Sequence, residues 1–225
     1  MPSVNIPQDS AGQKSMVPAK DSLMFDLVLV EDVVPGIRSD LKYASADNFM
    51  GMKLYQYWNK PMLQRFVALK LLRAQNRLKT LDSSLNLFVY DAARPVAVQR
   101  RMWLALDSIP PKERGKFVSS PYNKSLHNFG CAVDITLCDS HGIPVDMGAK
   151  FDDIRTIAYP SMEAYFLEID LLTVKQVENR RLLRKVMHAA GFTGIPTEWW
   201  HFNGCTKEYA LKHVKLINEE APFSK

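Results

Sequence analysis

The chain is poor in cysteine and has no long apolar run. Three of its 225 residues are cysteine, Cys131, Cys138 and Cys205, and no two of them form a C-x-x-C pair. An odd and small number without that spacing argues against a disulfide framework and against a cysteine-based zinc knuckle. No window approaches the roughly 18 consecutive apolar residues that a transmembrane helix needs, so no membrane span is expected.

The N-terminus lacks the basic start and apolar core of a signal peptide. Residues 1–22 are instead rich in Ser, Pro, Lys, Gln and Asp, which predicts a flexible lead-in followed by one domain over residues 23–225. The sequence as given therefore predicts a cytoplasmic protein. A periplasmic location is the alternative, because a polar segment of this kind would also remain after removal of an export signal.

Charge of one sign is not concentrated in any tract. The 29 Lys and Arg residues exceed the 24 Asp and Glu residues, which gives a formal net charge of +5, but the basic residues are scattered. Residues 179–185 come nearest to a basic run, and their helical spacing indicates a solvated helix face. Nucleic acid is therefore not expected as a partner. The hydrophobic fraction of 47% is that of an ordinary globular protein.

Hydrophobic periodicity divides the rest of the chain into strands and helices. A first strand is expected from Phe25 to Val34, followed by a turn at residues 35–36 and an ordered loop over residues 37–51. Helices are expected over residues 61–81, with Pro61 in the first turn, and over residues 96–106, 176–190 and 209–217. Further strands are expected over residues 85–90, 131–137 and 198–202, the second of them in a hairpin with a return strand at residues 143–145. Because strands and helices do not alternate strictly, the expected fold class is α+β, a single domain with a central, mostly antiparallel sheet flanked by helices.

Two short segments together carry the ligands of a catalytic zinc site. Residues 125–134 read Ser-Leu-His-Asn-Phe-Gly-Cys-Ala-Val-Asp, and residues 198–201 read Glu-Trp-Trp-His. A catalytic zinc ion needs three protein ligands, an open position for water and a base beside it. His127 and Asp134 can converge, since Gly130 permits a tight bend between them, and His201 would come from a neighbouring strand. We therefore expect a site for one zinc ion on the sheet.

The glutamate of the second segment has a different expected role. Glu198 and His201 are three residues apart, which would place them on opposite faces of a regular strand. A bulge, a bend or the end of the strand is therefore expected within residues 198–201. Glu198 is better interpreted as a general base than as a ligand, since it could take a proton from the zinc-bound water and deliver it to the leaving amine. Trp199 and Trp200 are interpreted as packing residues.

Arg94 follows a predicted strand in the sequence Asp-Ala-Ala-Arg-Pro at residues 91–95. By itself this arginine would be interpreted as a salt-bridged surface residue. Peptide hydrolysis develops negative charge on the tetrahedral intermediate, however, and a fixed guanidinium near zinc would stabilise that charge. Arg94 is therefore a candidate catalytic residue.

These residues resemble the zinc-dependent D-alanyl-D-alanine dipeptidases of the VanX type, which share the pattern Ser-x-His-x-x-Gly-x-Ala-x-Asp with other peptidoglycan peptidases. The pattern is complete at residues 125–134, residues 198–201 resemble the family's Glu-x-x-His element, and residues 34–51 resemble its N-terminal signature. The resemblance covers residues 30–205. Ala92 and Ala93 depart from the family's Asp-Gly-Tyr-Arg-Pro element, and Leu126 and Phe129 stand where relatives can carry polar groups. These departures concern the shape of the pocket and leave the metal ligands unchanged.

The resemblance implies a role for each candidate residue and a mixed α+β domain with a central antiparallel sheet. The implied roles are zinc binding by His127, Asp134 and His201, proton transfer by Glu198, and transition-state stabilisation by Arg94. It also implies that Tyr43, Ser125 and Asp152 line a small substrate pocket, in which Asp152 pairs with a free ammonium group.

The leading hypothesis is a zinc dipeptidase that cleaves the D-Ala-D-Ala dipeptide, and its specificity for D-residues rests on the resemblance alone. The nearest alternative is a D,D- or L,D-carboxypeptidase that acts on longer peptidoglycan stem peptides. A non-catalytic, zinc-containing binding domain is a third hypothesis, against which Glu198 and Arg94 argue, because a structural site needs neither. The expected partner is a small D,D-dipeptide, and no pattern in the sequence assigns an oligomeric state.

Overall fold

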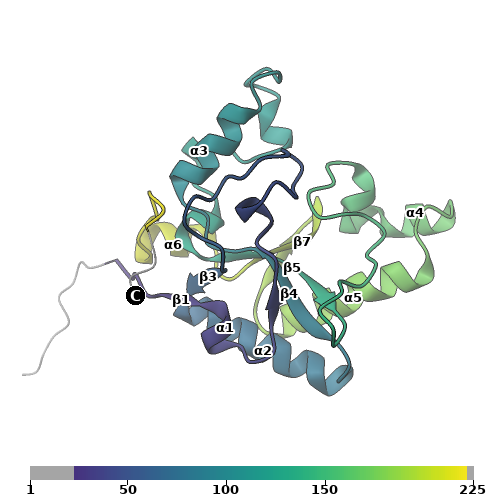
Figure 1. Cartoon of the computed structure of the whole chain (residues 1–225). Helices are drawn as coiled ribbons and strands as arrows, with labels where there is room; N and C mark the ends of the chain where they lie inside the picture. Colours follow the sequence, from purple (N-terminus) through teal and green to yellow (C-terminus); the bar gives the residue numbers. More distant parts are fainter. Residues whose placement is uncertain (1–22, 222–225) are drawn as a thin grey trace, which may run out of the picture.

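A five-stranded sheet forms the centre of the protein in this computed structural model, which describes residues 23–221 and, of Lys116, the backbone alone (Figure 1). The lead-in expected over residues 1–22 lies outside the described residues. The strands in their spatial order are β2 (Arg38–Ser39), β4 (Asn86–Asp91), β5 (Ala132–Cys138), β7 (Glu198–Asn203) and β6 (Thr193–Ile195). β2 and β4 are parallel, and every other neighbouring pair is antiparallel. The expected single-domain α+β fold with a mostly antiparallel sheet is confirmed.

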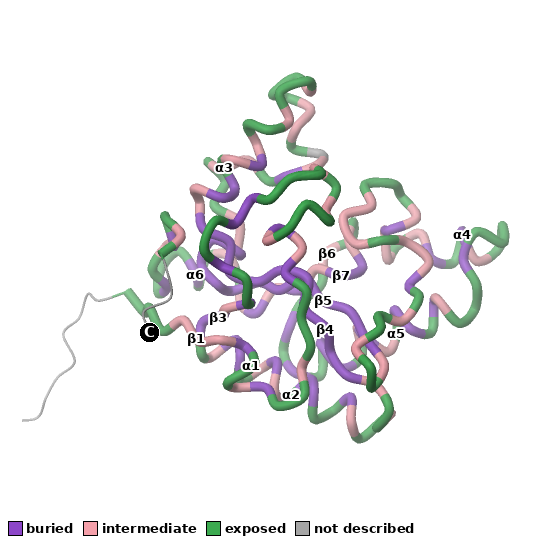
Figure 2. Tube along the Cα trace, viewed as in Figure 1, coloured by how far each residue is buried: buried purple, intermediate pink, exposed green. Residues whose placement is uncertain are grey.

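The two central strands, β4 and β5, are buried along their whole length (Figure 2). One face of the sheet is covered by α2 (Arg65–Leu81) and α5 (Val174–Ala189), which pack side by side (Figure 1). Their buried apolar residues follow a helical stripe and are Val67, Ala68, Leu71, Ala74 and Leu78 in α2 and Val177, Leu183, Val186 and Met187 in α5. The opposite side is left to α3 (Val96–Ala105) and to loops (Figure 1).

A second, two-stranded sheet precedes α2. It pairs β1 (Leu27–Leu29) antiparallel with β3 (Met62–Gln64), and α1 (Val30–Val33) follows β1 directly. The helix expected from residue 61 was therefore placed too early: it begins at Arg65, because residues 62–64 pair with β1. The expected end of the first strand, Val34, was too late, since the strand stops at Leu29. Pairing between distant segments, which local periodicity does not report, decided both boundaries.

The expected return strand after β5 and the expected last helix also differ from the structure. The chain turns after β5 as expected, but its return is an isolated bridge between Cys138 and Pro144, flanked by hydrogen bonds from the N–H group of Asp139 to the carbonyl oxygen of Ile143 and from that of Val145 to Leu137. The last helix, α6 (Lys207–His213), stops before Val214, which forms a bridge with Met24 instead. The remaining short helices are α4 (Glu163–Glu168) and the 3-10 turns η1 (Lys42–Ala44), η2 (Arg114–Lys116), η3 (Pro121–Asn123), η4 (Leu126–Phe129), η5 (Thr156–Ala158) and η6 (Pro160–Met162). None of the helices within residues 23–221 is long and apolar enough to cross a bilayer.

Candidate metal centre and active site

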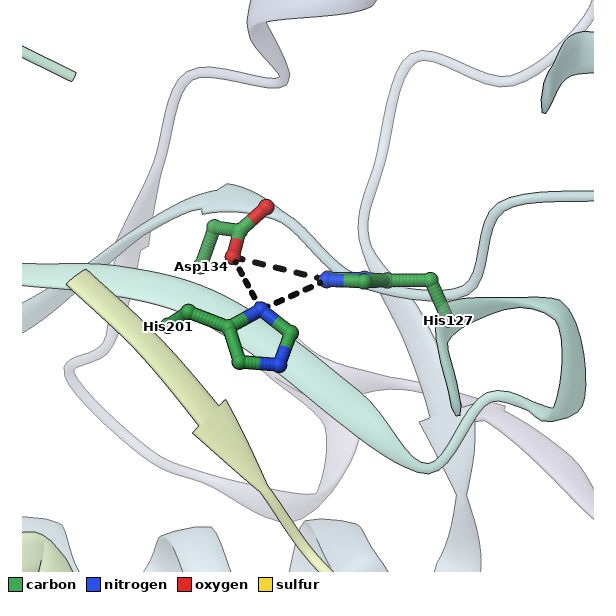
Figure 3. A group of neighbouring side chains, drawn as sticks. All are labelled: His127, Asp134 and His201. Carbon is green, nitrogen blue, oxygen red and sulfur yellow. Dashed lines mark hydrogen bonds and ion pairs between the residues drawn. The ribbon is translucent and has the colours of Figure 1, made fainter. Parts of the chain in front are cut away.

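The three side chains predicted to bind zinc lie together at the sheet (Figure 3). His127 comes from η4, Asp134 from β5 and His201 from β7. Oδ1 of Asp134 lies 3.0 Å from Nδ1 of His201 and 3.4 Å from Nε2 of His127, and the two nitrogens are 3.2 Å apart. Among residues 23–221, no other group of His, Cys, Asp and Glu side chains converges in this way. The group could therefore hold a metal ion.

Hydrogen bonds behind the two histidines determine which nitrogen of each ring faces this group. Nδ1 of His127 donates to the carbonyl oxygen of Ala92 over 2.6 Å, and Nε2 of His201 donates to Oδ1 of Asn203 over 2.8 Å. A carbonyl oxygen only accepts, so in each neutral ring the other nitrogen presents its lone pair to the group. Two imidazole nitrogens and one carboxylate oxygen form a ligand set that suits Zn²⁺.

The register of the sheet places Asp134 in a row with two other site residues. Asp134 is opposite His201 on β7 and opposite Asp91 on β4. The second pairing depends on a register shift directly before Asp91, without which Tyr90 would be opposite Asp134. The β-bulge in β4 therefore places a second carboxylate, that of Asp91, at the site.

β7 is irregular in the segment where the sequence predicts an irregularity. Gly194 of β6 pairs with Phe202, but the next residue, Ile195, pairs with Glu198, so residues 199–201 have no partner in β6. Although Glu198 and His201 are three residues apart, both side chains line the same cavity. The expected bulge is confirmed, and it accounts for a spacing that a regular strand would not allow.

Arg94 is buried and held between two aspartates. Its Nη2 lies 2.6 Å from Oδ2 of Asp91 and 3.4 Å from Oδ2 of Asp134. Nη1 donates to Oε1 of Gln99 over 3.2 Å, and the guanidinium carbon lies 4.9 Å from the centroid of the Tyr43 ring. Burial by itself would lower the pKa of Arg94, but the surrounding groups, first Asp91 and then Tyr43 and Asp134, together outweigh it and hold the pKa well above the ordinary range. Arg94 is thus a fixed cation beside the candidate metal ligand Asp134, not a surface residue.

Glu198 lies next to the metal group without joining it. Its Oε2 is 3.9 Å from Nδ1 of His201, and its side chain is 39% exposed, compared with 12% for His201. Desolvation in the cavity raises the pKa of Glu198 above its ordinary value, against the opposing effect of His201. A carboxyl group with a raised pKa in this position can take up and return a proton.

The three residues expected around the substrate line the same cavity. The hydroxyl group of Tyr43 donates to Asp152, 2.9 Å from Oδ2 and 3.0 Å from Oδ1. Burial, followed by the charge of Asp134, raises the pKa of Asp152 well above its ordinary range. A cation bound beside Asp152 would therefore stabilise the charged form of its carboxyl group. Ser125 caps η4, and its Oγ accepts from the N–H group of His127 over 3.3 Å.

The shared cavity has a volume of about 300 Å³, at the lower end of the range for ligand pockets, and therefore suits a small ligand. Sequence reasoning assigned no role to Asn203 and Lys207 in its wall, or to Asp91 and Gln99 behind Arg94. Asn203 could have been found, because it follows His201 by two residues and so shares its strand face. The other three depend on contacts that only the folded chain makes.

A buried His-Asp-His group beside a carboxylate and a fixed guanidinium is the arrangement of a mononuclear metallohydrolase centre. The chain belongs to the peptidase family M15, described as D-ala-D-ala dipeptidase, whose pattern it matches over residues 24–219. It is therefore a peptidase of this family, as the resemblance predicts.

The relatives cover most of the chain and carry the same description. The D-alanyl-D-alanine dipeptidase of Escherichia coli (strain K12) is 34% identical over 177 residues, which are 79% of this chain and 83% of the relative. That of Enterococcus faecium is 29% identical over 77% of this chain and 88% of the relative. That of Enterococcus faecalis (strain ATCC 700802 / V583) is 29% identical over 87% of this chain and 93% of the relative.

Proposed function

We propose that the protein is a zinc-dependent dipeptidase that hydrolyses D-Ala-D-Ala. One observation carries the proposal: the group formed by His127, Asp134 and His201 shares a single small cavity with Glu198 and Arg94. A structural metal site needs neither a base nor a fixed cation beside it, whereas in a hydrolytic site a base can move the proton of the attacking water and a fixed cation can stabilise the charge of the transition state. The substrate is inferred from the relatives, which are named D-alanyl-D-alanine dipeptidases.

His127, Asp134 and His201 would hold the zinc ion, and three protein ligands leave a coordination position open. When bound, the ion supplies Lewis acidity that lowers the pKa of water and polarises a peptide carbonyl group. The bonds from His127 to Ala92 and from His201 to Asn203 support this assignment, because they orient both rings.

Glu198 moves the proton in the proposed reaction. Its carboxylate accepts a proton from the attacking water and then delivers that proton to the nitrogen of the leaving D-alanine. The raised pKa of Glu198 and its place in the cavity wall support both steps. Proton uptake and proton delivery balance, so the residue returns to its carboxylate form.

Arg94 stabilises the negative charge that develops on the oxygen of the peptide bond. Its contacts with Asp91 and Gln99 hold the guanidinium before substrate arrives, so little reorganisation is needed during the reaction. Asp152, oriented by the hydroxyl group of Tyr43, binds the free ammonium group of the dipeptide.

The decisive experiment is Glu198→Ala, assayed for zinc content and for D-Ala-D-Ala hydrolysis. We expect the variant to retain one zinc ion per chain, because all three ligands remain, and kcat to fall by about 10²–10⁴-fold, the usual contribution of general acid–base catalysis. Glu178→Ala, which removes an exposed glutamate of α5, is the matched control and should change neither quantity. Loss of zinc would make Glu198 a ligand, and undiminished hydrolysis would remove it from the mechanism.

A carboxypeptidase acting on longer stem peptides is the second candidate, and one observation favours it. Asp152 and its neighbour Phe151 also line an adjacent cavity of about 580 Å³, which could take a peptide that extends beyond the dipeptide. Hydrolysis of free D-Ala-D-Ala is therefore to be compared with that of its N-acetyl derivative, which has no ammonium group for Asp152. Preference for the free dipeptide supports the first function, and preference for the acylated form supports the second. A zinc-loaded protein that cleaves neither, nor any L,L- or L,D-dipeptide, would be a binding domain.

A further inference from the structure

Lys207 is a second cation in the wall of the cavity that contains the metal-binding group. It is the first residue of α6, and its ammonium group donates to the backbone carbonyl oxygens of Asn123 and Lys124. These two residues directly precede Ser125, the cap of the turn that carries His127. The ammonium group is therefore anchored at a defined place beside the metal ligands.

No carboxylate among residues 23–221 forms an ion pair with this ammonium group. Arg94, the other lysine or arginine in the cavity wall, pairs with Asp91 and Asp134. Within the described part of the chain, Lys207 contacts the two carbonyl oxygens and forms no ion pair. Those contacts use two of its three N–H groups, so one remains for a ligand. Burial, followed by the charge of Lys124, lowers the pKa of Lys207, and an anion bound beside it would offset this effect.

The cavity wall thus presents one anchored group of each sign. Asp152 is held by Tyr43, and Lys207 by backbone carbonyl groups. Asp152 lies on the loop between β5 and η5 and Lys207 on α6, and within the described part of the chain the two side chains form no ion pair with each other, so both remain separate groups in the wall of one cavity. Separated groups of opposite sign are complementary to a zwitterion such as a free dipeptide.

We propose that Lys207 binds the C-terminal carboxylate of the dipeptide and, together with Asp152, sets the direction in which the dipeptide lies in the cavity. This inference rests on the proposed function, which supplies a zwitterionic substrate. In the productive direction the ammonium group meets Asp152, the carboxylate meets Lys207, and the scissile bond lies between the two contacts. The reversed direction would bring like charges together. Lys207 is a binding residue and takes no part in proton transfer.

The test compares D-Ala-D-Ala with D-alanyl-D-alaninamide, which lacks the one charge that Lys207 would recognise. Calorimetry measures the binding of each ligand to zinc-loaded Glu198→Ala protein, with and without the second change Lys207→Met. We expect Glu198→Ala protein to bind the acid about tenfold to a hundredfold more tightly than the amide, the range for a hydrogen bond between charged groups. Lys207→Met should abolish this preference. Lys207→Arg should retain it, as should the control Lys212→Met, which removes an exposed lysine of the same helix.

The ratio of the two affinities separates carboxylate recognition from structural damage, because a disturbed turn or metal site weakens both ligands alike. An unchanged ratio in Lys207→Met overturns the inference, as do equal binding of acid and amide by Glu198→Ala protein and binding of neither. Should Lys207→Met fail to fold, Lys207→Gln decides by the same ratio. Hydrolysis by the unmutated protein is measured in parallel. If the preference for the acid depends on Lys207 but the unmutated protein does not hydrolyse D-Ala-D-Ala, the proposed function is refuted and the carboxylate site stands. If the protein hydrolyses D-Ala-D-Ala but the ratio of affinities does not depend on Lys207, the proposed function stands and the carboxylate site is refuted.

Discussion

The orientation of each histidine in the metal-binding group depends on one hydrogen-bonding partner behind its ring. His127 is held by the backbone carbonyl of Ala92, and the neighbouring Ala93 accepts from the hydroxyl group of Tyr55 through its own carbonyl oxygen over 3.1 Å. Both alanines therefore act through backbone atoms, which any residue provides. Their departure from the family pattern leaves the metal-binding group intact for this reason.

Zinc uptake is expected to release about one proton from His201 at pH 7. Burial lowers the pKa of His201, but the hydrogen bond with Asp134 and the charges of Asp134 and Glu198 together outweigh it and raise the pKa to about 9 in the metal-free protein. The ring is therefore protonated below about pH 9 and must lose this proton to bind metal. From pH 7 to 9 the apparent zinc affinity should rise by about tenfold per pH unit and then level off.

Calorimetric titration of the metal-free protein in buffers of different ionisation enthalpy measures the proton release directly. His141→Ala, which removes an exposed histidine, should release the same number of protons. Zinc binding without proton release at pH 7 would show that His201 is neutral before the metal arrives.

At the scale of elements, the site is assembled by departures from regular geometry. The register shift in β4 brings Asp91 opposite Asp134, and the bulge in β7 brings Glu198 to the same cavity as His201. The turn η4 ends at Gly130, whose φ of 66° lies in the left-handed region. Regular strands and a regular helix would have dispersed these side chains over both faces of the sheet.

Gly130→Ala is expected to lower both stability and zinc affinity. An added Cβ would carry the cost of the left-handed conformation and would also lie 2.9 Å from Cδ2 of Leu27 and 3.3 Å from the backbone nitrogen of Gln64. We expect a loss of about 2–4 kcal/mol in the free energy of unfolding, measured by urea denaturation.

Gly51→Ala is the matched control for this change. Gly51 has a similar φ of 64°, but an added Cβ would meet nothing within 4 Å. The free energy of unfolding of this variant should fall by about 1 kcal/mol, the cost of the left-handed conformation alone, and the variant should bind zinc normally. Equal losses in the two variants would mean that the close packing around Gly130 is without consequence.

At the scale of the molecule, the helix that covers the sheet also anchors a loop of the site. Arg180 of α5 is fully buried, and it donates to the carbonyl oxygens of Met147 over 2.6 Å and of Ile157 over 3.0 Å. Asp152 lies on the loop between these two anchors and has a φ of 62°. The packing of α5 therefore reaches the substrate pocket through the backbone of this loop.

Removal of the metal is expected to destabilise the whole domain, because the three ligands come from η4, β5 and β7. A ligand that binds only the folded state at about 100 times its dissociation constant stabilises by about 2.7 kcal/mol. Chelation should therefore lower Tm by about 5–10 °C in a chain of this length. Calorimetry of the protein with and without chelator measures the shift, and His201→Ala, which should bind metal poorly, is expected to respond little. An unchanged Tm after the metal is lost would contradict preferential binding of the metal to the folded state.

The sequence by itself determined the family of this protein and its candidate metal-binding residues. The complete pattern at residues 125–134 and the Glu-x-x-His element identified the family, and the spacing of Glu198 and His201 predicted the bulge in β7. These inferences succeeded because ligand type and strand periodicity are local properties. The central strands were predictable for the same reason, since each is buried along its whole length, and so was α3, whose buried Val98 and Met102 follow helical spacing. The roles of Tyr43, Ser125 and Asp152, the lead-in over residues 1–22 and the cytoplasmic location stay predictions.

Only the tertiary structure decided how the site is completed. Asp91 and Gln99 hold Arg94, and Lys207 reaches the cavity from a helix that the sequence marks only as terminal. Likewise, α2 begins at Arg65 because β1 pairs with residues 62–64. These features depend on contacts between segments far apart in the chain, and the free energy of such contacts outweighs the local preferences that can be read from a sequence.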